Sequence, residues 1–388
     1  MSPIRVLIVD DSVVVRRLLS DLLSADPELE VAGVAADGHS ALAKIQAAPP
    51  DLVTLDVEMP GLDGLKTLAA IRASQPKLPV IMFSALTERA ARTTLEALSL
   101  GATDYVTKPS DVNSLAAALV QVREQLVPKI KALCARPKPR LKPLAAVVSV
   151  ARPSLAAPTA PPVTTSLRAP APAPTPRAPG EVDLVVIGSS TGGPNALAAI
   201  LPRLSRNLAT PVVIAQHMPP VFTRQLAARL AALSGLDVRE ASGGEALTPG
   251  SVWIAPGDFH LVVRRDGTSV RLAVHQGPPE NSCRPAVDVL FRSAAEVYGG
   301  RTLAVVLTGM GQDGLRGCQS VREAGGQVVV QDETSSVVWG MPGFVARAGL
   351  ANAVVPLDVI DTEITRRLKF GARARTSPTT RKEAPHGD

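Results

Sequence analysis

Aromatic side chains and cysteines are scarce in this sequence. Phe, Trp and Tyr make up 3% of its 388 residues, so stacking of nucleic-acid bases on aromatic rings is not expected to be a main function. The three cysteines, Cys134, Cys283 and Cys318, are widely separated and form no C-x-x-C pair, which argues against a disulfide framework and against a zinc site. We expect reduced thiols and cores built from aliphatic side chains and alanine.

The sequence also has no signal-peptide pattern and no apolar run as long as a membrane span. Acidic residues directly follow the first short apolar run, in MSPIRVLIVDDS. The formal net charge is +6, but much of the excess lies in 136–143 and 365–382, which resemble a tether and a tail. We expect a cytoplasmic monomer without membrane insertion. Nucleic-acid binding is not expected, because the second half has no basic recognition helix.

Composition divides the chain into two folded units. From Arg136 to Gly180 the sequence is dominated by Pro, Ala, Thr and Ser with no helical or strand period, which is typical of a semi-stiff, disordered linker. A chain of 388 residues is long for one core and comfortable for two. We therefore expect a first domain over 1–134, a flexible linker over 135–181, a second domain over 182–370 and a disordered basic tail over 371–388.

Both units read as α/β domains. The first alternates five short aliphatic runs with five amphipathic stretches, which predicts a doubly wound, five-stranded parallel sheet with helices on both faces. The second is predicted to be a mostly parallel α/β domain. Its insert, SVWIAPGDFHLVVRRDGTSVRLAV, reads as antiparallel strands around the Asp266-Gly267 turn. The other strands expected in the second unit are DLVVIG, PVVIAQH, TLAVVLTG and QVVVQ, with helices from about Pro194, Phe222, Pro285 and Leu357 and over Leu315 to Ala324.

Polar side chains stand at the ends of the strands in the first unit. They are Asp10 and Asp11 after the first strand, Asp56 at the end of the third, Ser84 at the end of the fourth and Lys108 at the end of the fifth. The carboxyl ends of parallel strands share one edge of a sheet, so all five are expected to converge. Clustered carboxylates favour a hard cation such as Mg²⁺. The alternative is that individual acids cap the following helices, as Asp11 or Ser12 could.

These residues carry a family resemblance. VDDS, LDVEMPGLDG, FSAL and the TKP of VTKPS occur in order, and residues 4 to about 125 resemble the receiver domain of two-component response regulators. The resemblance implies that Asp56 is the phosphoacceptor and a histidine kinase the donor. It also implies that Asp10 and Asp11 hold Mg²⁺ beside Asp56 together with the backbone carbonyl of Glu58, while Lys108 and Ser84 contact the phosphoryl oxygens.

The run VVIGSSTGGPNAL at 185–197 could bind phosphate or present a nucleophile. A P-loop interpretation fails, because Pro194 and Asn195 stand where G-x-x-x-x-G-K-[ST] needs Lys and then Ser or Thr. A dinucleotide-binding interpretation is weak, because Ser190 replaces the middle glycine and the next strand ends without an acid. G-x-S-x-G fits residues 188–192 without exception, which places Ser190 on a strand-to-helix elbow.

A serine hydroxyl becomes nucleophilic only beside a base that a carboxylate orients. Of the five histidines, only His217 ends a predicted parallel strand next to the one before Ser190, and Asp313 follows the aliphatic strand TLAVVL. The chain order 190, 217, 313 differs from that of the α/β-hydrolases. Spacing alone leaves a second interpretation open, in which the turn is only a turn, His217 lies at the strand edge and Asp313 caps a helix.

Residues 183 to about 365 carry a second resemblance. GSSTGG, QHMPP, APGDFHL, RPAVDVLF, LTGMGQDG and VVWGMPG are together similar to the catalytic domain of the chemotaxis protein-glutamate methylesterases, which join it to a receiver by a linker. The resemblance implies that Ser190 is the nucleophile, His217 the base and Asp313 the orienting acid, with the amide of Met310 and the turn around Thr191 near the oxyanion. No cofactor is implied for the ester chemistry.

The implied substrate is a glutamate methyl ester on the cytoplasmic helices of a chemoreceptor, hydrolysed to glutamate and methanol. Many family members also deamidate receptor glutamines. The resemblance implies that the unphosphorylated receiver covers the Ser190 edge and that phosphorylation of Asp56 opens it. Ser189 stands where alanine is commoner, and the linker is longer and richer in proline than in compact members. The rival interpretation is a second domain without catalysis that binds receptors or another signalling protein.

Overall fold

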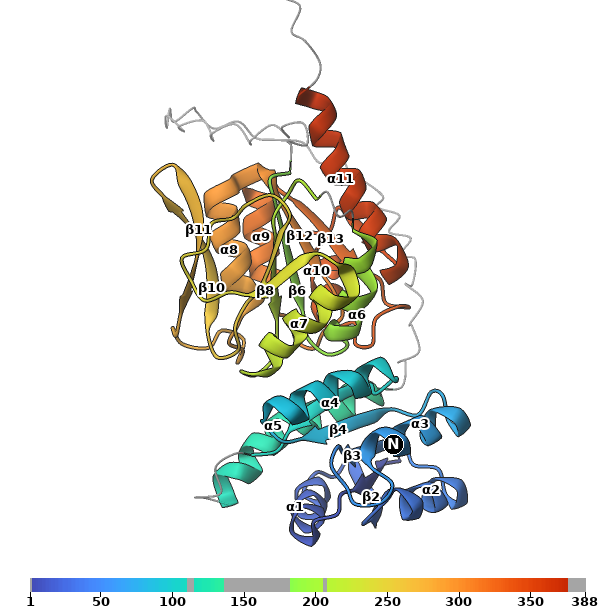
Figure 1. The fold of residues 1–388 in the computed structure, drawn as a ribbon. Coiled ribbons are helices and arrows are strands. Elements are labelled where there is room, and N and C mark those ends of the chain that lie inside the picture. The colour runs from blue at the N-terminus through green and yellow to red at the C-terminus, as the bar shows by residue number, and fades with distance from the viewer. Residues whose placement is uncertain (1, 110–114, 136–181, 205–207, 376–388) are drawn as a thin grey trace, which may run out of the picture.

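The computed structural model describes residues 2–109, 115–135, 182–204 and 208–375 (Figure 1). They form an N-terminal and a C-terminal α/β unit. The linker expected over 135–181 lies outside the described residues except for Ala135. The tail expected from 371 is described as far as Arg375, where it continues the last helix, and the rest of it is outside the described residues.

The N-terminal unit is a five-stranded, wholly parallel sheet in the order β2-β1-β3-β4-β5. All positions of the three strands β3, β4 and β5 are buried, as expected for a parallel sheet covered on both faces. The strands are β1 (Ile4–Val9), β2 (Leu29–Ala35), β3 (Leu52–Asp56), β4 (Val80–Ser84) and β5 (Asp104–Thr107), and the helices are α1 (Val13–Ser24), α2 (Gly38–Ala47), α3 (Gly64–Ser74), α4 (Glu88–Ser99) and α5 (Leu115–Leu133). The predicted topology is confirmed.

The C-terminal unit is built on a seven-stranded sheet in the order β14-β13-β12-β6-β7-β9-β8, in which all neighbours are parallel. Its strands are β6 (Leu184–Ser189), β7 (Val212–Gln216), β8 (Asp237–Glu240), β9 (Ser251–Ile254), β12 (Thr302–Val306), β13 (Gln327–Gln331) and β14 (Ala353–Val355). Its helices are α6 (Gly193–Ile200), α7 (Phe222–Ser234), α8 (Val287–Tyr298), α9 (Leu315–Glu323), α10 (Met341–Arg347) and α11 (Ile360–Arg375). The hairpin β10 (His260–Asp266) and β11 (Ser269–His275) is a separate antiparallel pair.

One expectation for this unit is wrong. Ser251–Ile254 was expected to belong to the antiparallel insert, but as β9 it pairs in parallel with both β7 and β8 inside the main sheet. All four of its residues are buried, so its continuous apolar character reflects a central position. Two short outer strands, β8 and β14, and the helix α10 were not predicted.

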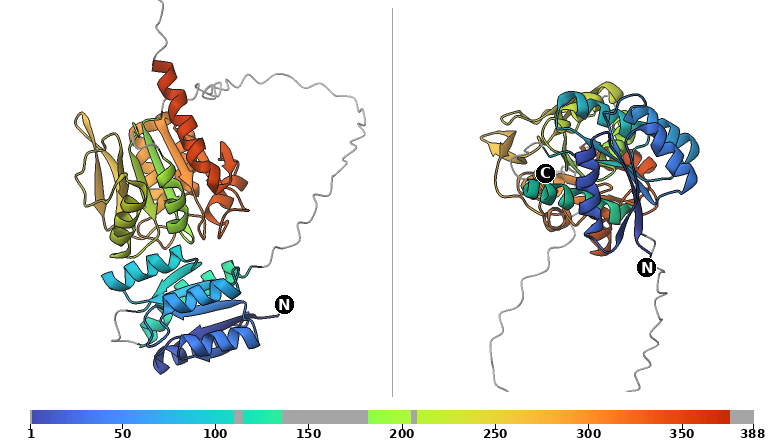
Figure 2. Two further views of the ribbon diagram at one scale, coloured as in Figure 1. Left: turned by 45° about the vertical axis from the view of Figure 1, so that its right-hand side comes forward. Right: turned by 90° about the horizontal axis from the view of Figure 1, so that it is seen from below.

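The two units pack against each other through α4 and β5 of the first and α6 and α7 of the second (Figure 2). The rings of Tyr105 and Phe222 stack with their centroids 4.8 Å apart and an interplanar angle of 4°. The amide Nδ2 of Asn195, in the first turn of α6, donates to the backbone oxygen of Leu98 at 2.8 Å. Both helices begin at the carboxyl ends of β6 and β7, so the N-terminal unit lies at that edge of the large sheet.

Within the described residues, none of the helices combines the length and the apolar character that crossing a lipid bilayer requires.

Candidate functional site

Three carboxylates meet at the carboxyl edge of the N-terminal sheet. Oxygens of Asp10, Asp11 and Asp56 all lie within 4.8 Å of one another. Lys108 Nζ is 2.8 Å from Asp56 Oδ2 and 3.0 Å from Asp10 Oδ2. Ser12 caps α1 through its side chain, as the capping alternative allowed, and Asp11 does not. Asp10 Oδ1 accepts the Ser12 N–H at 2.9 Å, while its Oδ2 belongs to the cluster.

Burial makes this cluster electrostatically unfavourable. Burial and the neighbouring Asp10 carboxylate raise the pKa of Asp56 to about 6, although Lys108 acts in the opposite direction. Burial lowers the pKa of Lys108, but Asp56 and Asp10 outweigh it and raise the value overall. Asp10 Oδ2 is buried and makes no hydrogen bond of acceptable geometry despite the nearby ammonium. An uncompensated set of oxygen ligands of this kind fits Mg²⁺.

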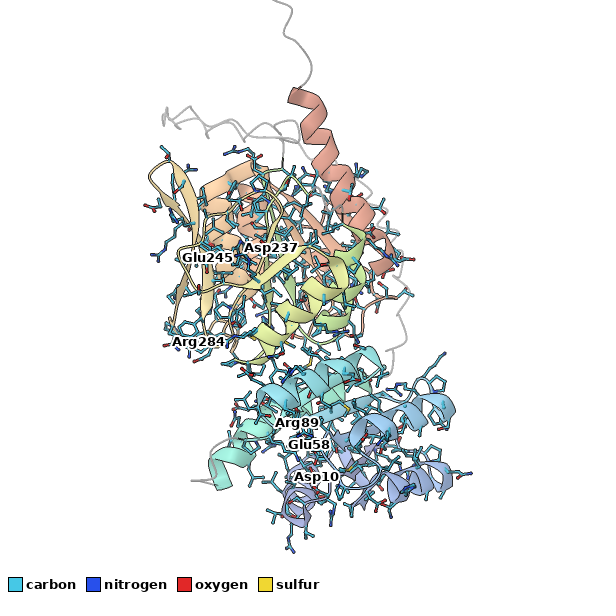
Figure 3. The ribbon with its side chains drawn as sticks, in the orientation of Figure 1. Asp10, Glu58, Arg89, Asp237, Glu245 and Arg284 are labelled. Atoms are coloured by element: carbon cyan, nitrogen blue, oxygen red, sulfur yellow. The ribbon has the colours of Figure 1, made fainter. Side chains whose placement is uncertain are left out.

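Glu58 and Ser84 lie next to the carboxylate cluster, but their side chains contact other residues. The Glu58 N–H donates to Asp56 Oδ1 at 3.3 Å, and the Glu58 carboxylate lies 3.8 Å from Arg89. Figure 3 labels Glu58 between Arg89 and Asp10. Ser84 ends β4 next to the Asp56 strand, but its hydroxyl accepts from Thr94 Oγ1 at 2.7 Å and is fully buried. The structure therefore turns Ser84 toward α4 and away from the carboxylates.

The serine turn follows β6 and is built to be tight. The Ser190 N–H donates to Thr308 O at 3.1 Å, which ties the turn to the loop after β12. Gly192 has φ +78, a conformation that favours glycine. A Cβ at Gly309 would lie 2.8 Å from the Ser190 Cβ, so the two loops can approach only because residue 309 has no side chain.

His217 and Asp313 form a pair beside this turn. The His217 N–H donates to Ser189 O at 3.0 Å, which fixes the histidine next to Ser190 in the adjacent strand. Its Nε2 lies 2.7 Å from Asp313 Oδ2. The side chain of His217 is 12% exposed and that of Asp313 is 2% exposed. The pair is thus largely shielded from water and lies at the predicted edge of the sheet.

Asp313 does not cap the helix that follows it. Its carboxylate accepts the N–H groups of Val287 at 2.6 Å and Asp288 at 2.9 Å, which lie in the first turn of α8, where helix N–H groups and the helix dipole favour an anion. Burial raises the pKa of Asp313, but the hydrogen bonds from His217 and from these amides outweigh burial and lower it. Asp313 is held as a carboxylate.

The structure does not join Ser190 to His217 by a hydrogen bond. The Ser190 hydroxyl has no hydrogen-bond partner among the described residues. The second ring nitrogen, His217 Nδ1, instead lies 3.5 Å from Cys283 Sγ. Of the predicted triad, the histidine and the acid are therefore paired, and the serine is their neighbour through the backbone.

The N–H groups of Thr191 and Met310, the expected oxyanion donors, are not engaged in hydrogen bonds within the described residues. Thr191 follows β6 and Met310 follows β12, and these two strands are parallel neighbours. The Thr191 hydroxyl is also buried without a partner.

Three residues in this region were missed by sequence reasoning. Asn281 Nδ2 donates to Asp313 Oδ1 at 2.9 Å and to Asp288 Oδ2 at 3.0 Å, and Cys283 contacts His217. Burial and the nearby Asp313 raise the pKa of Asp288. The only sequence signal was the RPAVDVLF motif, which begins one residue after Cys283 and contains Asp288.

A carboxylate cluster at the end of a five-stranded parallel sheet, joined to a histidine–aspartate pair beside a G-x-S-x-G turn, defines a class of protein: a response regulator with a hydrolase-like output domain. The family model for the response regulator receiver domain matches residues 6–120. The family model for CheB methylesterase matches residues 185–364.

Relatives of known name match nearly the whole chain. A protein-glutamate methylesterase/protein-glutamine glutaminase of Nocardioides sp. strain JS614 is 53% identical, over 97% of this chain and 98% of that protein. One of Trichodesmium erythraeum is 50% identical, over 95% of this chain and 100% of that protein. The crystal structure of the Thermotoga maritima CheB methylesterase catalytic domain is 45% identical and covers 48% of this chain and 98% of that one, with a TM-score of 0.47. This chain belongs to the protein-glutamate methylesterase/protein-glutamine glutaminase family.

Proposed function

We propose that this protein hydrolyses glutamate methyl esters of chemoreceptors with Ser190 as nucleophile, His217 as base and Asp313 as orienting acid. The observation that carries the site assignment is the 2.7 Å contact between His217 Nε2 and Asp313, next to the serine turn. The named relatives support a protein-glutamate methylesterase that takes part in chemotaxis adaptation, with protein-glutamine glutaminase as a second activity.

The proposed reaction is acyl transfer in two steps. Ser190 Oγ attacks the ester carbonyl carbon while His217 Nδ1 takes the hydroxyl proton, and Asp313 stabilises the resulting imidazolium. The free N–H groups of Thr191 and Met310 would bind the oxyanion. The proton on His217 passes to the leaving methoxide, which departs as methanol and leaves an acyl-serine. Water, deprotonated by His217, then attacks the acyl carbon and releases glutamate and Ser190. With glutamine the leaving group is ammonia.

The receiver would be phosphorylated on Asp56 by a histidine kinase. Asp10, Asp11 and Asp56, with the Glu58 carbonyl, would hold Mg²⁺, which supplies charge neutralisation for phosphoryl oxygens when bound. Lys108 already contacts the carboxylates of Asp10 and Asp56 and would also neutralise an oxygen of the phosphoryl group. Ser84 would have to leave Thr94 to donate to the phosphoryl group.

The contact between the two units suggests how phosphorylation reaches the esterase. The receiver packs on α6 and α7, whose first turns follow Ser190 and His217. We propose that this packing restricts access of a receptor helix to Ser190 and that phosphorylation of Asp56 shifts the population toward an open form. The test compares hydrolysis with and without a small phosphodonor, in the native protein and in Asp56→Asn. Indifference to both changes contradicts the regulatory claim.

We also propose that the protein acts in the cytoplasm as a monomer, with functional domains over 1–134 and from 182 onward. The expected receptor glutamates and the kinase would both be met in that compartment. Sedimentation of the full chain, with and without phosphodonor, tests the oligomeric state, and a dimer in either state would contradict this part.

The experiment for the chemistry is methanol release from membranes that carry methylated chemoreceptor. Ser190→Ala should abolish release while leaving phosphorylation by a small donor intact. Ser189→Ala is the matched control, since the Ser189 hydroxyl is turned to Gln216 at 2.6 Å and is not expected to react. Retained release in Ser190→Ala would mean another nucleophile. Absence of release from the native protein, phosphorylated or not, would favour a binding module.

A further inference from the structure

Gln216, the last residue of β7, lies between the proposed nucleophile and the proposed base. It pairs with Ser189 in the sheet, so the residues that follow the two strands are Ser190 and His217. Gln216 is only 1% exposed. A buried amide is stable only when its N–H groups and its oxygen find hydrogen-bond partners. The partners of Gln216 therefore indicate what this side chain does.

These partners fix the orientation of the amide. Gln216 Nε2 donates to the backbone oxygens of Ser190 and His217, each at 3.0 Å, and Oε1 accepts from the Ser189 hydroxyl at 2.6 Å. Carbonyl oxygens only accept, so the opposite orientation of the amide would set Oε1 against two oxygens. One side chain thus links the backbone of the nucleophile to the backbone of the base.

The hydrogen bond to Ser190 O bears on the expected oxyanion site. Ser190 O and the Thr191 N–H belong to one planar trans peptide unit, in which the C=O and N–H bonds point in opposite directions. A group that fixes the direction of the carbonyl therefore fixes the direction of the N–H. A donor to the carbonyl also polarises the peptide and strengthens its N–H as a donor. The Gly193 N–H donates to the same oxygen at 2.8 Å, so two donors hold this peptide.

The space for the amide depends on Gly193, the first residue of α6. A Cβ at this position would lie 2.0 Å from Gln216 Oε1 and 2.8 Å from Ser189 Oγ. The backbone of Gly193 does not have a positive φ, so space and not conformation requires glycine here. An alanine at residue 193 would push the amide away from its partners and leave the side chains of Ser190 and His217 unchanged.

Resting on the proposed function, we propose that Gln216 is a positioning residue for the ester hydrolysis. Its amide holds the peptide between Ser190 and Thr191 so that the Thr191 N–H is aimed at the oxyanion, and it holds the backbone of His217 beside the serine turn. Because Gln216 is buried, it acts through these backbone groups and does not contact the substrate. An oxyanion donor acts on the transition state, so the contribution of Gln216 belongs to kcat and not to KM.

The kinetics of the full chain separate a positioning amide from one that only stabilises the fold. Methanol release is measured from membranes that carry methylated chemoreceptor. Gln216→Met keeps the length of the side chain and loses both donated hydrogen bonds, so kcat should fall about 10–100-fold while KM stays unchanged. The rate at which a serine-directed fluorophosphonate modifies Ser190 should fall by a similar factor, because its phosphoryl oxygen also needs the oxyanion donors.

Three further variants control this result. Ser189→Ala leaves both donated hydrogen bonds of Gln216 in place, so its kcat should stay within about threefold of the native value. Ser234→Ala removes two hydrogen bonds with the backbone at the other end of α7 and should lower the Tm without changing kcat. Gly193→Ala displaces the amide and should reproduce the loss of kcat at unchanged KM. Adding Gln216→Met to Gly193→Ala should cause no further loss, because both substitutions break the same contacts.

The outcomes separate this inference from the proposed function. If Ser190→Ala abolishes release while Gln216→Met and Gly193→Ala keep the native kcat, the proposed function stands and the inference is overturned. A loss of kcat in Ser234→Ala equal to that in Gln216→Met would assign the effect to stability and would overturn it too. If the Tm and circular dichroism show that Gln216→Met does not fold, Gly193→Ala decides by the same criterion. If Ser190→Ala retains release, the proposed function itself fails.

Discussion

The two sites lie at the same edge of two parallel sheets, yet they treat a buried aspartate in opposite ways. Asp56 lies against Asp10 with one ammonium as its main relief, and its pKa is raised to about 6. Asp313 accepts five donors, and its pKa is lowered. Those donors are His217 Nε2, Asn281 Nδ2 and the N–H groups of Val287, Asp288 and Gly314.

The number of hydrogen-bond donors around each aspartate indicates its chemical role. A carboxylate left short of donors is ready to accept a cation or a phosphoryl group, while one saturated with donors is a fixed charge that orients a histidine. Position in the fold is thus shared, and the supply of hydrogen-bond donors separates a phosphoacceptor from an orienting acid.

The largest effect is expected from the same substitution made at the two acids. Asp313→Asn should reduce kcat for methanol release by about 10⁴-fold, because the amide cannot hold the Nε2-protonated tautomer of His217. Phosphorylation by a small donor should be unaffected. The same change at Asp56 should abolish phosphorylation instead. Methanol release and phosphate incorporation, measured on both variants, check this, and a loss of hydrolysis below tenfold in Asp313→Asn would contradict the contrast.

The next effect concerns the donors that make Asp313 different. Asn281→Ala removes one of them and should lower kcat by about 10–100-fold, the loss typical of a group that orients a site residue, with KM unchanged. Ser282→Ala is the matched control, because Ser282 shares the turn and its left-handed backbone. Steady-state kinetics on both variants would show the difference. Equal values of kcat for the two variants would mean that the turn matters and the amide does not.

The raised pKa of Asp56 predicts a pH-dependent stability penalty. An acid whose pKa rises on folding binds more protons when folded, so stability falls as pH rises from about 4 to about 6 and stays reduced above that. Asp56→Asn removes the penalty and should stabilise the protein by about 3 kcal/mol at pH 7.5 and very little at pH 4. Thermal unfolding at the two pH values measures this.

Mg²⁺ supplies the control for that measurement. It should raise the Tm of the native protein at pH 7.5 and raise that of Asp56→Asn much less, because a cation relieves the same repulsion. A stability gain in Asp56→Asn that is equal at both pH values would contradict the origin assigned to the penalty.

The smallest effect is expected at the contact between the units. Asn195→Ala removes the hydrogen bond to Leu98, worth about 1 kcal/mol net, and should increase hydrolysis by the unphosphorylated protein up to about fivefold. The difference from the native protein should disappear once Asp56 is phosphorylated. Initial rates of methanol release in both states check this. A variant that gains equally in both states would argue that Asn195 acts on α6 and not on the domain contact.

Much of this molecule could be predicted from its sequence, because buried parallel strands leave long aliphatic runs. Ser190, His217 and Asp313 could be placed at one edge of the sheet because each lies in the loop after such a run, and the carboxylates of the N-terminal unit could be placed for the same reason. Short outer strands gave no comparable signal: of the four residues of β8, only Val238 is buried. Ser251–Ile254 was misassigned because a buried strand followed by a hairpin looks continuous with it.

The parts of the site that were missed depend on tertiary contacts. Cys283 and Asn281 lie in a turn without periodicity, and only its anchoring to α8 and to the loop after β12 brings them to His217 and Asp313. Asp288 lies in the first turn of α8, where its N–H donates to Asp313, and its place in a predicted helix did not reveal this contact. The inward orientation of Ser84 depends on Thr94, ten residues away, and no local pattern specifies it.

Covalent trapping tests the central claim most directly, which is that Ser190 is the hydroxyl activated by the His217–Asp313 pair. The full chain is treated with a serine-directed fluorophosphonate and digested, and the adduct is located by mass spectrometry. We predict one adduct, on Ser190, that is lost in His217→Gln. An adduct on Cys283, or no adduct on a protein that releases methanol, would contradict the account.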